Sequence, residues 1–444
     1  MPLHPTTVST LGFKGLNNVL RPEKTDITYL KKALNIDLDK VGAVSKREGY
    51  TKVDTAAFTS LWSSENDLGC YAVRNGDLVE IHDDFSYTTI RSGVGTSKLS
   101  FEEVDGIIYY VSNEVTGIIV DGVSRNWGIP KNLLAPILSI TSGTLSSGTY
   151  QVSYTYVNSF GIESGTVNSS FIDVPNNSGI SLYIPTHSDP SVLYARIYCS
   201  TPDGTINYYS GIGVLGANYI VASISSFSNQ MRTQGLDTAP TGHIVKYYRG
   251  RLYIAQDNIL WYTEPYQYQH VDMTSNFFEF PERIREVMPV EDGIWIGSDK
   301  LYYLSGEQPD EFKRTTKEHI KIVEGTSSIV SGSYVHIDNT PIGYKWLVTS
   351  DLGIFILFNQ GMTINLTSQN VEIERASSGT ALFLRSKGTN QYLSVLKTTG
   401  SPNNSVLGDL VESRIIRNER IFHDNINTVD SVTILHTRNG ITIP

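Results

Sequence analysis

Residues 292–304 read DGIWIGSDKLYYL, and this stretch decides the fold. A glycine turn is followed by a strand of β-branched and aromatic residues, a polar tight turn and a second such strand, which is the pattern of a β-hairpin. Two more copies have the same pattern, VDGIIYYVSNEVTGIIV at 104–120 and RGRLYIAQDNILWY at 249–262. One such hairpin cannot bury both of its faces, so the copies must pack around a common core. The sequence therefore predicts an all-β protein built on a β-propeller.

Looser copies at 68–81, 345–357 and 381–395 extend the series of hairpins. The residues that close the first strands of the six hairpins are Ala72, Val111, Ala255, Gly297, Val348 and Leu384. Subtraction gives intervals of about 39, 144, 42, 51 and 36 residues, against roughly 40–50 residues for one propeller blade. Only the second interval is too long, and its surplus of about a hundred residues is the size of one immunoglobulin-like sandwich.

The long interval contains alternating segments that are typical of antiparallel strands, at 149–157, 180–185, 192–199 and 218–222. We therefore predict a propeller of about six blades or hairpin units, interrupted by a fibronectin-III- or immunoglobulin-like sandwich. The expected parts are an N-terminal extension feeding the propeller (1–50), first blades (51–130), the inserted sandwich (131–240), remaining blades (241–400) and a C-terminal closing segment (401–444).

The two ends of the chain carry weaker patterns. Asp26 is a candidate N-cap for a short helix over 28–34, and 33–50 reads as a strand, a tight turn and a second strand that feed the first blade. Residues 431–436 alternate between apolar and polar side chains. Because a propeller ring is usually closed by a strand from one terminus, this segment is the candidate closing strand.

Composition and charge exclude some classes of function. The chain has 444 residues, of which 45 are acidic and 35 basic, for a formal net charge of −10. Affinity for phosphate comes from Lys and Arg, so an acidic chain is a poor general DNA binder, although its charge suits a surface past which DNA slides. Cys70 and Cys199 fall in different expected domains, so we expect them to be two buried thiols rather than a disulfide. This is typical of a protein that is synthesised in a reducing cytoplasm. Neither a membrane-spanning run nor a signal-peptide pattern is present in the sequence.

Two motifs of the sequence resemble enzyme or cofactor signatures. Residues 211–216 match GxGxxG, but a strand follows rather than a phosphate-facing helix, so a sandwich turn is the better interpretation. Residues 349–355 partly match the Asp-box turn of sialidase propellers, which is itself a structural hairpin turn. Paired carboxylates remain possible in any propeller, so a glycosidase stays open as an alternative. No catalytic, cofactor-binding or metal-ligating residue is predicted, and no GxSxG elbow or Cys/His cluster occurs.

Three further groups have a structural interpretation that we prefer to a functional one. The acidic pairs Asp37/Asp39 and Asp83/Asp84 lack EF-hand spacing and are interpreted as solvated turns. Arg414, Arg417 and Arg420 recur at helical spacing beside Glu412 and Glu419, which favours ion pairs over a nucleic-acid stripe. The aromatic run at 261–268 suits blade packing or a protein interface better than a sugar platform.

The opening of the chain carries a resemblance to a known family. It reads FKGLNN at 13–18, ALNIDLD at 33–39, then Gly42 and KREGY at 46–50. Together with the hairpin series and the sandwich insert, this resembles the tail nozzle or hub proteins of short-tailed bacteriophages, whose members have been called tail tubular protein B or packaged-DNA stabilisation protein. The resemblance covers most of the chain and includes no catalytic signature.

The resemblance implies a non-enzymatic structural protein of the virion tail, assembled in the host cytoplasm. Such a protein forms a homohexameric ring below the portal and the head–tail adaptor, with tailspikes or fibres and a plug or needle attached around it. Its channel conducts DNA without sequence-specific binding, retaining and then releasing the genome. The implied protein needs no cofactor and does not insert into a membrane. The alternative from another class is a carbohydrate-binding or glycan-cleaving propeller that acts as a receptor-binding protein.

Overall fold

The computed structural model describes residues 12–31, 36–38, 42–46, 54, 56, 58–64, 66, 68–166, 168–223, 229–332, 334–335, 337, 340, 342–368, 370–373, 375–386, 389–398, 405–407, 409–412, 415–418, 435–437 and 440–442. The regular structure of these residues consists of strands and three short 3-10 helices. The 3-10 helices are η1 (Pro22–Lys24), η2 (Pro309–Glu311) and η3 (Asn359–Gly361). The prediction of an all-β protein is confirmed.

Six antiparallel sheets, called sheets 1 to 6 here, succeed one another along the chain, and each is a simple meander. Sheet 1 contains β5 (Phe58–Ser63), β6 (Cys70–Arg74), β7 (Asp77–Ile81) and β8 (Tyr87–Arg91). Sheet 2 contains β9 (Ser100–Val104), β10 (Ile107–Val111), β11 (Thr116–Val120) and β12 (Val123–Arg125). Sheet 3 contains β20 (Ile244–Tyr248), β21 (Arg251–Gln256), β22 (Ile259–Tyr262) and β23 (Phe277–Glu279).

The remaining three sheets repeat the meander. Sheet 4 contains β24 (Glu286–Val290), β25 (Gly293–Gly297), β26 (Leu301–Ser305) and β27 (Lys313–Glu318). Sheet 5 contains β28 (Ser328–Val330), β29 (Lys345–Ser350), β30 (Gly353–Leu357) and β31 (Thr363–Asn365). Sheet 6 has three strands, β32 (Ala376–Ser386), β33 (Thr389–Thr398) and β34 (Ser405–Leu407). In sheets 1 to 5 the predicted hairpin is the central pair of strands. In sheet 6 it is the first pair.

Tight turns with two left-handed residues join several of these strands. Asn75 and Gly76 have φ of 52° and 87°, and Asp105 and Gly106 have φ of 52° and 78°. Two consecutive positive φ angles are the mark of the type I′ turn, whose twist matches that of an antiparallel hairpin. Glycine is favoured at the second position because a Cβ atom strains the left-handed conformation. This is why the polar-glycine pairs of the sequence predict the hairpins.

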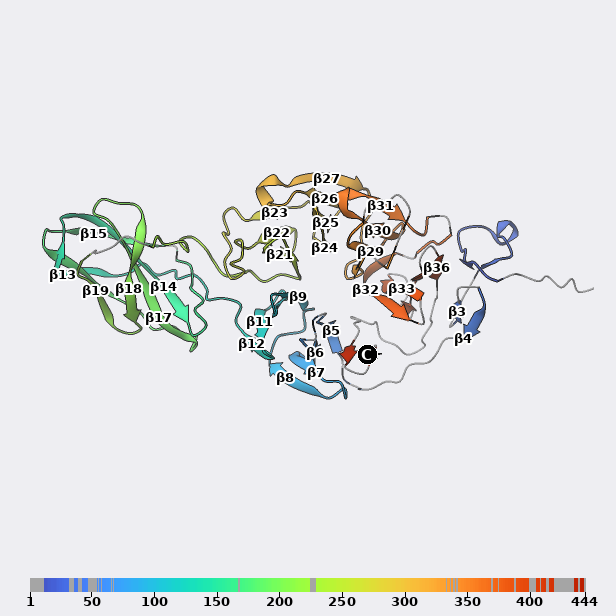
Figure 1. Ribbon diagram of the computed structural model, residues 1–444, viewed down its shortest axis with the longest axis horizontal. Coiled ribbons are helices and arrows are strands. Elements are labelled where there is room, and N and C mark those ends of the chain that lie inside the picture. The colour runs from blue at the N-terminus through green and yellow to red at the C-terminus, as the bar shows by residue number, and fades with distance from the viewer. Residues whose placement is uncertain are drawn as a thin grey trace, which may run out of the picture.

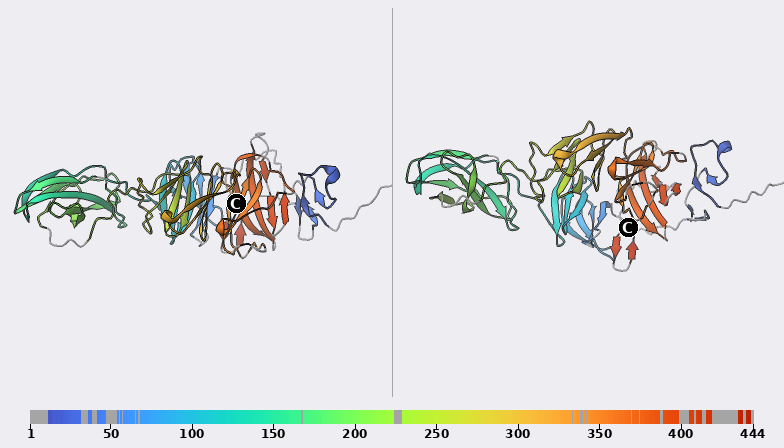
Figure 2. Two further views of the ribbon diagram at one scale, coloured as in Figure 1. Left: turned by 90° about the horizontal axis from the view of Figure 1, so that it is seen from above. Right: turned by 45° about the horizontal axis from the view of Figure 1, so that its top comes forward.

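Apolar side chains pack between consecutive sheets rather than in one central core. Tyr71 and Phe101 belong to a buried cluster shared by sheets 1 and 2, whereas Tyr109 and Leu252 belong to one shared by sheets 2 and 3. Three further clusters lie between sheets 3 and 4, 4 and 5, and 5 and 6. Sheets 2 to 5 therefore bury both faces against their neighbours, which is the packing of a propeller-like body, and Figures 1 and 2 show the sheets around a common centre.

Indole side chains add hydrogen bonds across the sheet boundaries. Trp295 of sheet 4 donates its Nε1–H to the carbonyl oxygen of Phe358, which follows β30 of sheet 5, at 2.8 Å. Trp346 of sheet 5 donates in the opposite direction, to the carbonyl oxygen of Pro289 at 2.7 Å. Buried indoles need such a partner, because an unpaired N–H in the core is costly. These two bonds fix the position of sheet 4 relative to sheet 5.

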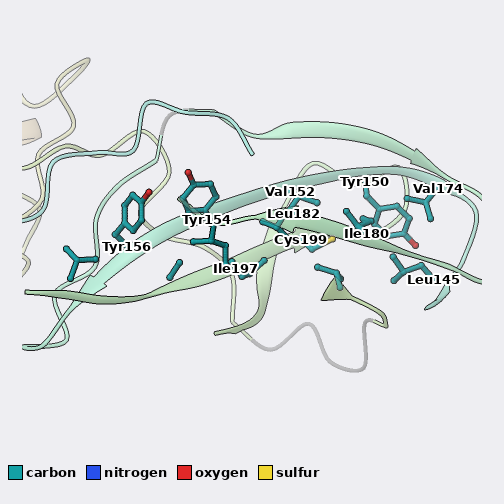
Figure 3. Packing of buried hydrophobic residues seen from close by; sticks show 14 of the residues in the cluster. Leu145, Tyr150, Val152, Tyr154, Tyr156, Val174, Ile180, Leu182, Ile197 and Cys199 are labelled. Atoms are coloured by element: carbon teal, nitrogen blue, oxygen red, sulfur yellow. The ribbon is translucent and has the colours of Figure 1, made fainter. Parts of the chain in front are cut away.

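A two-layer β-sandwich is inserted between sheets 2 and 3, within the predicted 131–240 insert. Its first sheet has the order β13 (Leu138–Leu145), β16 (Ser178–Tyr183) and β19 (Asn218–Val221). Its second sheet has the order β15 (Ser170–Val174), β14 (Gly148–Asn158), β17 (Val192–Ser200) and β18 (Asn207–Val214). Side chains of the two sheets, among them Leu182 and Val152, face one another in a separate core (Figure 3).

The N-terminal prediction is partly wrong. Instead of a helix over 28–34, the described residues form β2 (Tyr29–Leu30), which pairs in parallel with β1 (Gly15–Leu16). Asp26 accepts hydrogen bonds from the backbone N–H and the hydroxyl of Thr28, at 2.8 and 2.7 Å, so it closes a local Asx turn and caps no helix. The expected strand pair is present as β3 (Ile36–Leu38) and β4 (Val44–Lys46), but it forms a sheet of its own rather than part of sheet 1.

The C-terminal prediction also needs correction. Only residues 435 and 436 of the candidate closing strand are described. They lie in β37 (Leu435–Thr437), which pairs with β38 (Gly440–Thr442) and, among the described residues, with no strand of sheet 1. The arginine-bearing segment is a strand pair, β35 (Asp409–Glu412) with β36 (Ile415–Asn418), and no helix. Arg417 lies in β36, while Arg414 and Arg420 lie outside the described residues.

Candidate functional site: the axial cavity

The first strands of five sheets and the turn that precedes the first strand of sheet 5 line one cavity. Its volume is about 450 Å³, and its lining includes residues of β5, β9, β20, β24 and β32 and the turn before β28. A second cavity of about 580 Å³ shares Trp62, Lys246 and Ser327 with the first, so the two are successive parts of one axial space. The sandwich contributes no residue to either part.

A repeated hydrogen bond connects the first strands around this cavity. In each case a side-chain oxygen on one sheet accepts a hydrogen bond from a backbone N–H at the inner edge of the next sheet. The pairs are Ser60 Oγ with Leu99 at 2.8 Å, Ser100 Oγ with Val245 at 3.1 Å, Glu286 Oε1 with Gly325 at 2.6 Å and Ser328 Oγ with Phe383 at 2.8 Å. These bonds use backbone donors that would otherwise be unpaired at the inner edges of the sheets.

Glu286 is the most unusual of these acceptors because it is a carboxylate that is only 5% exposed. Its Oε2 accepts a hydrogen bond from the Ser327 hydroxyl at 2.6 Å, in addition to the Gly325 bond of its Oε1. Burial raises the pKa of the Glu286 carboxyl above its ordinary value, and these hydrogen bonds and the nearby Lys98 oppose that rise. The carboxyl therefore connects sheet 4 to sheet 5 at the cavity wall.

A histidine makes the corresponding connection between sheets 3 and 4. His243 Nε2 donates to the carbonyl oxygen of Ile284 at 2.6 Å, since a carbonyl can only accept. Burial lowers the pKa of the His243 imidazole, which keeps the ring neutral near pH 7. Its Nδ1 atom is buried with no hydrogen-bond partner among the residues that the structure describes.

The two ends of the axial space differ in charge. The first cavity is lined by the four cations Lys98, Lys246, Arg285 and Lys397 against the two acids Glu286 and Glu324. The second cavity has the three acids Glu102, Glu103 and Glu291 against two cations, Lys246 and Arg249. Within the described part of the chain, no group of three His, Cys, Asp or Glu side chains is placed to hold a metal ion. Several charged groups of the axial space connect neighbouring sheets, among them Glu286 with Ser327 and Lys246 with Glu102.

The motifs weighed from the sequence lie apart from this cavity. Residues 211–214 of the GxGxxG match belong to strand β18, so their interpretation as a turn is wrong, and only Leu215 and Gly216 lie in the turn that follows. Residues 349–355 span the end of β29, the hairpin turn at 351 and 352 and the start of β30, as the structural interpretation predicts. Asp84 accepts hydrogen bonds from the backbone and hydroxyl of Ser86 in an exposed turn. Asp37 lies in β3, and Asp39 lies outside the described residues.

The aromatic run and the cysteines serve packing. Trp261 and Tyr268 are each 8% exposed and belong to the core between sheets 2 and 3, whereas Tyr266 of the same run is 76% exposed. Cys70 and Cys199 are buried free thiols, as predicted, and burial raises the pKa of each to about 12. No helix among the described residues has the length and apolar character needed to cross a membrane.

Comparisons with known protein families and with curated proteins found no match to this chain. Among solved structures, the Neurospora crassa Pan2 WD40 domain matches with a TM-score of 0.31 and 9% identity, over 87% of this chain and 86% of that one. Kluyveromyces lactis Hsv2 matches with a TM-score of 0.31 and 8% identity, over 82% and 98%. BBS1N from a complex with ARL6DN matches with a TM-score of 0.32 and 8% identity, over 84% and 95%. At these scores the similarity carries no argument about this chain.

Proposed function

We propose that this chain is a structural subunit of a bacteriophage tail, a nozzle or hub protein that assembles into a homohexameric ring below the portal and the adaptor. In this proposal the body is a six-bladed propeller and the insert is a fibronectin-III-like sandwich. The ring retains the packaged genome and then lets it pass, and it carries tailspikes or fibres and a plug or needle. The subunit acts mechanically, without a cofactor, in the virion tail.

The layout of the chain is the observation that carries the proposal. The propeller-like body lies between the sandwich and the N-terminal strands, which project at opposite ends of the molecule (Figures 1 and 2). A closed ring needs two different patches on opposite sides of each subunit, because its contacts are heterologous. The N-terminal piece is fastened to the body, since the Asn18 side chain donates to the Glu372 carbonyl and accepts from the Glu372 N–H, at 2.9 and 2.8 Å. Both ends are thus available as ring contacts.

An apolar patch at the base of the sandwich suits one of these contacts. It consists of Leu133, Leu134, Ile137 and Phe171, which are between 62% and 81% exposed. The two segments that carry it are joined, because Asn168 Nδ2 donates to the Leu133 carbonyl at 3.0 Å. Exposed apolar patches of this kind mark protein–protein contacts. We assign this patch to the neighbouring subunit of the ring.

The test is the oligomeric state of the purified full chain, measured by mass photometry and by negative-stain imaging with and without the adaptor protein. The proposal expects a ring of six copies, and Ile137→Asp should abolish it by placing a charge in the contact. Leu352→Asp is the matched control, because Leu352 is 60% exposed on the turn between β29 and β30 of the body. A chain that stays monomeric with the adaptor present and cleaves a glycan would instead establish the receptor-binding alternative.

A further inference from the structure

A polar cleft lies where the sandwich meets the propeller-like body. Its volume is about 730 Å³. Tyr194, Arg196 and Tyr198 line it at alternate positions of β17, which places all three on the same face of the sheet. The body contributes Gln267 and Gln269 from the loop after β22. Of the fourteen lining residues, only a glycine and an isoleucine lack a polar side-chain group.

The wall of the cleft is preorganised around Glu163. This carboxylate is 11% exposed and accepts hydrogen bonds from Arg196 Nη1, Tyr198 Oη and Thr155 Oγ1, each at 2.6 Å. Charge-assisted bonds of this kind fix the orientation of the arginine and the tyrosine. The side chain of Arg196 remains 39% exposed, and its guanidinium has five N–H donors, more than the Glu163 bond uses.

Two buried polar atoms of the cleft lining lack partners within the described part of the chain. His270 is 3% exposed, and its Nε2 donates to the Glu163 carbonyl oxygen at 2.7 Å, which leaves Nδ1 as an acceptor without a donor. Thr233 is 6% exposed, and its hydroxyl is likewise unpaired. Both atoms lie beneath the surface of the cleft, whereas the polar side chains that line it suit a ligand rich in hydroxyl groups.

The charges that line the cleft favour a ligand that carries a negative charge. Arg232 lines the cleft, is exposed, and makes no ion pair with a carboxylate among the described residues. Because Glu163 is already paired with Arg196, the cleft carries one uncompensated positive charge. Arginine binds carboxylates through two parallel hydrogen bonds, and tyrosine rings offer apolar faces with a polar edge.

We propose that this cleft binds an acidic oligosaccharide, a sugar chain that carries uronic-acid or similar carboxylate groups. The sugar hydroxyls pair with the side-chain amides and the tyrosine hydroxyls that line the cleft, while a sugar carboxylate pairs with Arg232. Tyr194 packs against the C–H face of a sugar ring. The site lies on the sandwich and its junction, so it does not rest on the ring that we propose for the whole protein.

The test presents the full chain to an array of oligosaccharides that includes both uronic-acid-containing and neutral chains. The proposal expects binding confined to acidic chains. The strongest binder is then titrated by calorimetry against the wild type and three variants. Arg232→Ala should weaken binding about tenfold, as expected for a hydrogen-bonded charge pair, and Tyr194→Ala should also weaken it. Arg21→Ala, which removes an exposed arginine from the N-terminal segment, should leave binding unchanged.

Three outcomes would overturn the proposal. The first is an absence of binding to any acidic chain on the array. The second is equal binding of neutral and acidic chains with no effect of Arg232→Ala. The third is binding of an acidic peptide, tested as hexaglutamate, in place of the sugars. Circular dichroism of each variant confirms that a loss of binding is not a loss of folding.

Discussion

Replacing Glu286 with alanine tests the connection between sheets 4 and 5. The carboxylate accepts hydrogen bonds from Gly325 and from the Ser327 hydroxyl, both at 2.6 Å, and a longer one from the Ser327 N–H at 3.4 Å. A buried donor left without a partner costs about 1–3 kcal/mol. Water in the adjoining axial cavity replaces part of what is lost, so Glu286→Ala should lower the free energy of unfolding by about 3 kcal/mol.

The assay is urea unfolding followed by tryptophan fluorescence. The chain has five tryptophans, and none falls within the sandwich strands, so the signal reports on the propeller-like body. Glu279→Ala is the matched control, because Glu279 is an exposed glutamate on the outermost strand of sheet 3. A loss below about 0.5 kcal/mol for Glu286→Ala, equal to that of the control, would refute the assigned role, since surface substitutions typically have effects of that size.

The same site has a pH signature. Burial raises the pKa of Glu286 above its reference value of 4.5, so the folded state holds the proton more tightly than the unfolded state does. Stability contributed by the protonated carboxyl is therefore lost as the pH rises from 4.5 through the raised pKa. Glu286→Gln cannot ionise, and its stability relative to the wild type should rise over that interval. A difference between the two proteins that does not change with pH would contradict this linkage.

Three further predictions concern the packing. Trp295→Ala should lower the free energy of unfolding of the body by about 3–5 kcal/mol in the same fluorescence assay, and a loss under about 1 kcal/mol would contradict its buried role. Cys70 and Cys199 should resist a thiol reagent in the native protein, because burial raises the pKa of each to about 12, and both should react in guanidinium; fast native labelling would count against burial. Gly165→Ala should loosen the sandwich–body junction, because its Cβ would lie 1.8 Å from the Leu236 carbonyl oxygen; hydrogen exchange of the junction unchanged from wild type would oppose this.

The sequence predicts the central hairpins of the sheets well because their side chains are apolar. Strand β25 is buried along its whole length, and its residues 293–297 read GIWIG. The innermost and outermost strands carry weaker signals. Strand β27 reads KRTTKE and is exposed at five of its six residues, so it shows no apolar alternation. In sheets 1 to 5 the apolar pattern therefore locates the two central strands and leaves the two edge strands undetected.

The axial cavity was not predicted, because its residues become neighbours only when distant strands meet. Ser60 and Ser100 are ordinary polar residues in the sequence, and each finds its backbone partner on the next sheet, 39 and 145 residues away. The sequence signal for the cavity residues would have been a polar residue that recurs just before each predicted hairpin. The prediction of an N-terminal helix was wrong because an aspartate can form an Asx turn as readily as it caps a helix. Asp26 forms such a turn with Thr28.

The central claim is that the sheets close around one axis, and a crosslink between Lys98 and Lys397 tests it most directly. Both lysines are exposed and line the same cavity, Lys98 from beside β9 of sheet 2 and Lys397 from β33 of sheet 6. A short amine-reactive crosslinker, applied to a mixture of isotopically light and heavy chains, distinguishes links within one chain from links between copies. The closed arrangement predicts an abundant Lys98–Lys397 link within single chains. Links confined to lysines of consecutive sheets would show an open row of sheets and contradict the account.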